Sequence, residues 1–388
     1  MDLHHNVGHG RHRQRWTRLR IALIILSLVL FAGASIAALL WTTGPSTPGD
    51  PGQAALSSTA SESTTEERQT EASRTTGSPA PAASTANPVI GPAVATGMAP
   101  HYMAIAPDGR FAYIADPAAG AVIRFDTASG SATATIPVPE APPEMVTFSP
   151  DGSRAYVSAY TEDYSANYVV TIDTATGIEI DAVPVARGPY AAGTTPDGRL
   201  LYVPYYDDDH LDVLDTSSGA MVARIPAAPC PHWVVFTQDG RLAYTTNHFS
   251  DVVTVLDVEA NTVVSTIPVG DGPHSLEMSP DGTHIAVVNY IGGDVSVIDT
   301  GSNTVVSTVP DVGAGPQDVT YAPDGRHFYT ANVDDGTVAV VDARTGAVTA
   351  RIPTGDSPTS ISVSPDGRRA FVTNFGDGTV RLLDTATG

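Results

Sequence analysis

Three histidines occupy the same local position in this sequence, because each directly follows a proline. They are His101, His232 and His274. Imidazoles that meet around one cavity can bind Zn or Cu, with Glu144 as a fourth ligand or a general base. The alternative is that each histidine makes a local hydrogen bond at a structural junction. The sequence leaves both interpretations open, and it specifies no cofactor beyond this candidate divalent metal site.

Two segments, 160–168 and 205–210, combine tyrosines with acidic residues. Aromatic faces and carboxylates brought together can clamp a cation or stack on a flat ligand. Two solvated acidic loops are the competing interpretation. With neighbouring residues of the same kind, the candidate ligand-binding set is Glu144, Tyr160, Tyr164, Tyr190, Tyr205, Tyr206, Asp207, His210 and Trp233.

The single cysteine, Cys230, lies two residues before His232. A thiolate beside an imidazole can serve as a metal ligand or a nucleophile. A lone thiol can equally act as a small buried apolar residue, and we favour this second interpretation.

These candidate residues are embedded in a repeat. The tripeptide Pro-Asp-Gly, or a close variant, recurs at intervals of 42 to 46 residues. Repeats of about 40–45 residues with four short strands each are typical of propeller blades. We therefore predict an all-β, seven-bladed β-propeller. The repeated aspartates are Asp108, Asp151, Asp197, Asp239, Asp281, Asp324 and Asp366.

The last repeat stops before its fourth strand, while residues 87–97 read as a fourth strand without a blade. We expect this N-terminal strand to complete the seventh blade and close the ring. The Pro-Asp-Gly turns then lie on one face of the ring. The connections between blades, which carry the candidate residues, lie on the other face, where loops commonly hold function.

The second strand of each repeat carries a further motif. Its closest form is Phe371-Val372-Thr373-Asn374, and Tyr244-Thr245-Thr246-Asn247 is a looser copy. In this motif the chain resembles the YVTN family of β-propellers over about residues 88–388. The resemblance implies the propeller fold and a cell-envelope or surface-layer protein. Related propellers include lactonases, a streptogramin lyase and quinone- or copper-bearing oxidoreductases.

The chain before the repeats divides into three parts. Residues 1–20 are basic, residues 21–41 are an uncharged apolar run, and residues 42–86 are rich in Ser, Thr, Pro and Ala. An apolar run of this length after a basic flank predicts a single-pass membrane anchor. We expect a cytoplasmic tail, a transmembrane segment, a disordered linker and an extracytoplasmic propeller over 87–388. A cleaved signal peptide, which would release the protein, is the alternative.

The formal net charge of −22 repels phosphate backbones and excludes nucleic acid as an expected partner. We favour a monomeric, membrane-anchored propeller that binds an envelope protein or a small cationic ligand. A lactonase-like hydrolase or lyase with a metal at the channel mouth is the first alternative. A redox propeller, which needs a quinone or copper, is the weaker one.

Overall fold

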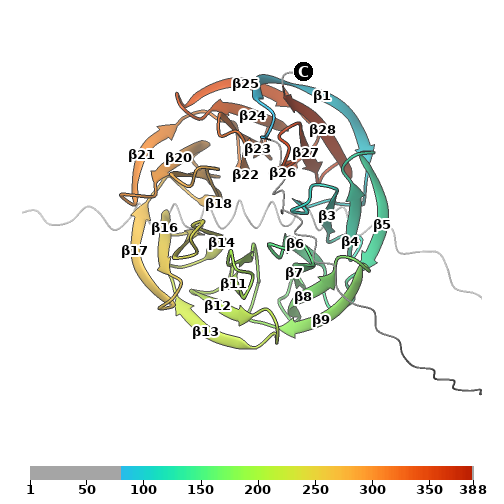
Figure 1. Cartoon of the computed structure of the whole chain (residues 1–388), viewed down its shortest axis with the longest axis vertical. Coiled ribbons are helices and arrows are strands. Elements are labelled where there is room, and N and C mark those ends of the chain that lie inside the picture. The colour runs from blue at the N-terminus through green and yellow to red at the C-terminus, as the bar shows by residue number, and fades with distance from the viewer. Residues whose placement is uncertain (1–79, 387–388) are drawn as a thin grey trace, which may run out of the picture. The chain divides into compact units, whose positions relative to one another are not determined.

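The computed structural model describes residues 80–386, and in this range the chain forms a closed ring of strands without helices (Figure 1). Seven four-stranded antiparallel sheets surround a central channel, which confirms the predicted seven-bladed propeller. In each of the first six blades the first strand lies nearest the channel and the fourth lies at the rim. Each sheet packs face to face against its neighbours, so the middle strands are buried on both sides.

The strands of the first four blades follow one another along the chain. Blade one holds β2 (Tyr102–Ile105), β3 (Phe111–Asp116), β4 (Ala121–Asp126) and β5 (Ser131–Pro137). Blade two holds β6 (Pro143–Phe148), β7 (Arg154–Tyr160), β8 (Asn167–Asp173) and β9 (Ile178–Pro184). Blade three holds β10 (Gly193–Thr194), β11 (Leu200–Pro204), β12 (His210–Asp215) and β13 (Met221–Pro226). Blade four holds β14 (Pro231–Phe236), β15 (Leu242–Asn247), β16 (Val252–Asp257) and β17 (Thr262–Pro268).

The last three blades complete the ring. Blade five holds β18 (Pro273–Met278), β19 (His284–Asn289), β20 (Asp294–Asp299) and β21 (Thr304–Val309). Blade six holds β22 (Pro316–Tyr321), β23 (His327–Asn332), β24 (Thr337–Asp342) and β25 (Ala347–Pro353). Blade seven holds β26 (Pro358–Val363), β27 (Arg369–Asn374), β28 (Thr379–Ala386) and, as its outer strand, β1 (Ser84–Ala95).

The ring closes through β1, which pairs antiparallel with β28 (Figure 1). This strand begins at Ser84 rather than at residue 87, inside the segment that the composition predicts as linker. Ser84 explains the earlier start, because it bonds to the neighbouring blade. Its hydroxyl donates to Asp324 Oδ1 at 2.8 Å and lies 2.7 Å from His327 Nδ1. The N-terminal strand therefore ties blade six to blade seven.

Hydrogen bonds sort the connections onto two faces, as predicted. The Thr300 hydroxyl donates to the Gly282 carbonyl at 2.8 Å, which joins the two turns of blade five on one face. Gly282 has φ +73°, the left-handed conformation that this tight turn requires. On the other face, the Tyr290 N–H donates to the Gly272 carbonyl at 2.8 Å. We call the face of Gly282 the turn face and the face of Gly272 the loop face.

The predicted tail, membrane anchor and most of the linker lie outside the described residues. Within residues 80–386, no helix is long and apolar enough to cross a membrane.

Ring closure by β1 is testable by truncation. A chain that begins at Met98 loses the outer strand of blade seven and exposes the edge of β28. We expect its melting temperature to fall by about 5 °C, which corresponds to roughly 3 kcal/mol for a domain of this size. A chain that begins at Ala80 is the control. Equal melting temperatures for the two chains, measured by calorimetry, would contradict the closing role of β1.

Candidate functional site

His232 and His274 meet at the loop-face end of the channel. They are the second residues of the neighbouring inner strands β14 and β18, and their Nε2 atoms lie 3.1 Å apart. One imidazole therefore donates to the other. The two side chains are almost fully buried, at 2% and 8% exposed. The Nδ1 atom of His232 has no hydrogen-bond partner among the described residues.

The pair is held in its neutral form. Burial, followed by the charges of the neighbouring histidines, lowers the pKa of His232 and of His274 well below its ordinary value. A neutral imidazole keeps a free lone pair, which is the form that binds metals. The chemistry of the pair is therefore that of a metal ligand rather than that of a proton donor.

A third imidazole, His248, joins this pair from the loop after β15. Its ring centroid lies 5.4 Å from that of His232 and 5.6 Å from that of His274. Its Nδ1 lies 3.2 Å from the Pro273 carbonyl, so Nδ1 carries the donated proton and Nε2 stays free to accept. Burial lowers the pKa of His248 to about 4. We call His232, His248 and His274 the imidazole cluster.

Sequence reasoning missed His248. The signal for it was its place directly after the second-strand motif, where other blades carry Tyr290 or Phe375. That position lies on the loop face of every blade, and only blade four fills it with a histidine.

Aromatic side chains surround the imidazole cluster. The ring centroid of Tyr190 lies 4.0 Å from that of His232, and Tyr206 lies 5.2 Å from it. Tyr290 lies 6.0 Å from His274. Phe249 contacts both Tyr206 and His248 and is 47% exposed, so it faces the solvent. These rings form an aromatic wall of Tyr190, Tyr206, Phe249 and Tyr290.

His101 does not join the cluster and has the opposite protonation behaviour. Its Nδ1 lies 3.2 Å from Glu144 Oε2, and its ring makes an edge contact with Phe375. Burial alone lowers the pKa of His101, but the hydrogen bond to Glu144 and the charge of that residue raise it above the ordinary value. His101 is therefore paired with Glu144 and holds its proton more tightly than a free imidazole does.

The predicted metal set of His101, His232 and His274 is thus divided between two places. Within residues 80–386, no three His, Cys, Asp or Glu side chains are arranged to hold a metal ion. Metal binding by these three residues stays a prediction.

The two predicted ligand segments do meet, through an arginine between them. The Tyr160 and Tyr164 rings stack with centroids 5.5 Å apart. The Arg187 guanidinium lies 5.0 Å above Tyr164 and 3.1 Å from Asp207. These contacts occupy the faces that a ligand would use, so a ligand at this place would have to displace Arg187.

Two of the predicted ligand-binding residues point into blade three instead. Tyr205 is fully buried, and its hydroxyl donates to Asp212 Oδ2 at 2.9 Å. His210 lies 3.1 Å from Asp208 Oδ1 and packs against the Tyr205 ring. Asp212 also binds Arg224, so this network holds the blade together.

Cys230 is explained by its backbone conformation and not by the reactivity of its thiol. In blades three to seven the residue before the inner-strand proline has positive φ, and in blade four this residue is Cys230, with φ 61°. The equivalent residues in blades three and five are Gly188 and Gly272. Burial raises the pKa of the Cys230 thiol to about 12, which leaves no thiolate near neutral pH.

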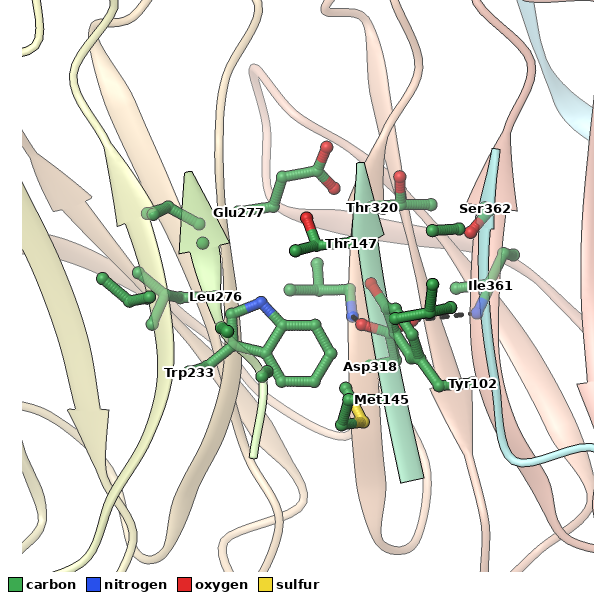
Figure 2. Close-up of a pocket in the computed structure, with 18 of the residues that line it drawn as sticks. Tyr102, Met145, Thr147, Trp233, Leu276, Glu277, Asp318, Thr320, Ile361 and Ser362 are labelled. Atoms are coloured by element: carbon green, nitrogen blue, oxygen red, sulfur yellow. Dashed lines mark hydrogen bonds between the residues drawn. The ribbon is translucent and has the colours of Figure 1, made fainter. Parts of the chain in front are cut away.

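Below the imidazole cluster, aromatic side chains narrow the channel (Figure 2). Trp233 and Tyr102 come from opposite sides of the ring and make an edge contact at 5.1 Å between centroids. Met145 and Leu276 lie beside them. We call Tyr102, Met145, Trp233 and Leu276 the channel plug. Of these, only Trp233 was expected at a site, and it packs inside the channel rather than on the surface.

A cavity of about 320 Å³ lies in the channel at the plug. It is lined by inner strands from all seven blades, and its polar groups include Glu277 and Asp318 (Figure 2). Burial raises the pKa of Asp318 to about 7 and that of Glu277 to about 8. Sequence reasoning missed both carboxylates, because a single acidic residue in a strand gives no signal of facing a channel.

The comparisons with known proteins give a match to a family model over part of the chain and a similar fold. Residues 197–320 and 293–387 match the model of the cytochrome D1 heme domain. The matched segments contain the whole imidazole cluster but not His101. Among curated proteins, no sequence match was found.

A solved structure of Kuenenia stuttgartiensis hydrazine synthase is similar in fold, with a TM-score of 0.67. It is 23% identical and covers 76% of this chain and 98% of its own. At this identity the similarity supports the fold alone. Neither comparison names the YVTN family or a cell-envelope location, which stay predictions.

These findings correct the function that we favoured from the sequence. A propeller that acts only as a ligand- or protein-binding module is contradicted by the match to a heme-domain model. The redox propeller, which was the weaker alternative, agrees better with this match.

The neutral state of the histidine pair predicts sensitivity to acid. Below about pH 6.5 the unfolded chain takes up protons on these histidines while the folded chain does not. Folding stability is therefore full above pH 6.5 and falls as the pH drops toward the lowered pKa values, on the order of 1 kcal/mol per pH unit for each histidine. The double variant His232→Gln/His274→Gln should lose less stability between pH 7 and pH 5 in urea unfolding. His284→Gln, on the turn face, is the control, and identical losses in all three proteins would disprove the buried neutral pair.

The raised thiol pKa predicts an inert cysteine. At pH 7.5 the folded protein should resist iodoacetamide for hours, whereas the urea-unfolded protein should be alkylated at Cys230 at the rate of a free thiol. Mass spectrometry of timed samples measures both rates. Rapid alkylation of the folded protein would restore the interpretation of Cys230 as a reactive residue.

Proposed function

We propose that this chain is a heme-binding redox propeller, with the heme held at the loop face beside the imidazole cluster. The observation that carries the proposal is that the segments similar to a heme domain contain all three neutral, buried histidines. Imidazole is a common axial ligand of heme iron.

The residues present fit such a group. His232 and His274 would hold the iron of such a group, because both are neutral imidazoles and their mutual hydrogen bond is the only contact that engages their Nε2 atoms among the described residues. The aromatic wall offers flat apolar surfaces for a planar macrocycle, and the solvent-exposed Phe249 lies on the side from which it would enter. A bound heme would supply one-electron redox chemistry at its iron.

The protein's own groups then have separate tasks. The imidazole cluster stays neutral and can bind the iron. His101, whose pKa is raised by the hydrogen bond to Glu144 and by its charge, can hold a proton at the same mouth. The channel plug limits exchange between this mouth and the rest of the channel.

A hemin titration of the full chain tests the proposal. We expect one hemin per chain and a shifted, sharpened Soret band, which signals an axial imidazole. The double variant His232→Ala/His274→Ala should bind at least tenfold more weakly, a loss of about 1.4 kcal/mol or more. His284→Ala is the matched control, because it removes a histidine from the turn face.

Melting temperatures of the variants separate loss of the site from loss of the fold. Equal hemin affinity and equal spectra for the wild type and the double variant would refute a heme site at the imidazole cluster.

A further inference from the structure

We propose that Glu277 and Asp318 form a proton relay within the channel, which passes protons through the ring toward His101 at the mouth. The inference deepens the proposed function, because it assigns a proton supply to the same mouth. Neither residue belongs to the imidazole cluster, and both line the cavity at the channel plug.

The strongest observation is a comparison between blades. In three neighbouring blades, the third residue of the inner strand accepts a hydrogen bond from a backbone N–H of the next inner strand. Serine does this in blades five and seven, whereas Asp318 does it in blade six. The three bonds are Val319 N to Ser275 Oγ, Ile361 N to Asp318 Oδ2 and Met103 N to Ser360 Oγ, each of 3.0 Å. A serine hydroxyl is therefore enough to accept this backbone hydrogen bond between neighbouring blades. The fold does not require the buried carboxyl of Asp318 at this position.

Burying a carboxyl without need is costly, because the charged form loses its water. Asp318 is 2% exposed, and within residues 80–386 no arginine forms an ion pair with it. The groups that face it are the backbone N–H groups of Ile361 and Val319, the Ser275 hydroxyl and the charge of His101. Its own charge acts in turn on Tyr102 and Tyr190.

Glu277 lies further along the cavity, near Thr147 and Thr320 (Figure 2). Its Oε2 accepts the Tyr321 N–H at 3.0 Å, and the Thr320 hydroxyl also bonds to it. The charge of Asp318 raises its proton affinity further. Both carboxyls therefore exchange protons near neutral pH, which is the property that a relay requires.

The cavity and the plug give the relay its path. A cavity of about 320 Å³ has room for several waters, each of which takes about 30 Å³ in the liquid. The contact between Tyr102 and Trp233 blocks larger solutes, while Asp318 lies at the same level of the channel (Figure 2). The Asp318 carboxyl can thus carry a proton past the channel plug, although the plug blocks larger molecules.

Each transfer is balanced. When the His101–Glu144 pair gives up a proton at the mouth, Asp318 returns one to it, Glu277 reloads Asp318, and solvent water reloads Glu277. One proton enters for each one that leaves, and no electron moves.

Infrared difference spectroscopy of the heme-free full chain tests the relay. Protonated carboxyl bands should disappear with midpoints at about pH 7 and about pH 8. Asp318→Ser, which copies Ser275 and Ser360, should fold normally and lose the lower transition. Glu277→Gln should lose the upper one. Asp299→Asn, a change at the turn-face end of β20 and outside the cavity, should change neither.

Transfer itself is read from the rate at which the Asp318 band shifts after rapid mixing with D₂O. Glu277→Gln should slow this exchange at least tenfold, and Glu277→Asp should restore much of it. An unchanged exchange rate in Glu277→Gln, or no protonated carboxyl at pH 6, would overturn the relay. Because these measurements need no heme, failure of the relay and failure of the heme site are seen separately.

Discussion

Closure of the ring is the constraint on which every other feature depends. A blade of four short strands cannot bury both of its faces alone, so each sheet needs a neighbour on either side. Pairing of β1 with β28 completes the seventh sheet and covers the edge that β28 would otherwise expose. Once the circle is complete, the inner strands begin side by side around one channel. Residues far apart in the sequence, such as His101 and His274, then line the same mouth.

At the loop-face mouth of the channel, histidines at the same position of two blades differ in their pKa. His101 and His232 both follow an inner-strand proline, yet the pKa of His101 is raised and that of His232 is lowered. The difference comes from the neighbouring side chain: Glu144 faces His101, whereas a second imidazole and tyrosine rings face His232. A carboxylate within hydrogen-bond distance outweighs the cost of burying charge, and an aromatic environment does not.

The sequence predicts the fold well because each repeat carries its own turn residues, and the period counts the blades. It also predicts which residues begin the inner strands, since the prolines mark those positions. It does not predict partners across the channel. The pairing of His232 with His274, the approach of His248 and the burial of Asp318 depend on blade tilt and on side chains from other repeats. The sequence also does not predict that Tyr205 and His210, both candidates for a ligand site, pack inside blade three, where Tyr205 bonds to Asp212 and His210 begins strand β12. The function was misjudged because neutral histidines on separate blades form no continuous motif.

The contact between Tyr102 and Trp233 has a consequence for transport. A propeller channel that is open at both faces is a tube, through which a molecule can enter on one side and leave on the other. The side chains of Tyr102 and Trp233 touch across the channel axis and obstruct the channel at this level, so the propeller resembles a cup rather than a tube. Whatever binds at the loop face must depart by the way it came, so arrival of a second molecule waits on release of the first. The time a molecule spends in the cup is then set by the loops around its rim and not by the length of the channel beneath it.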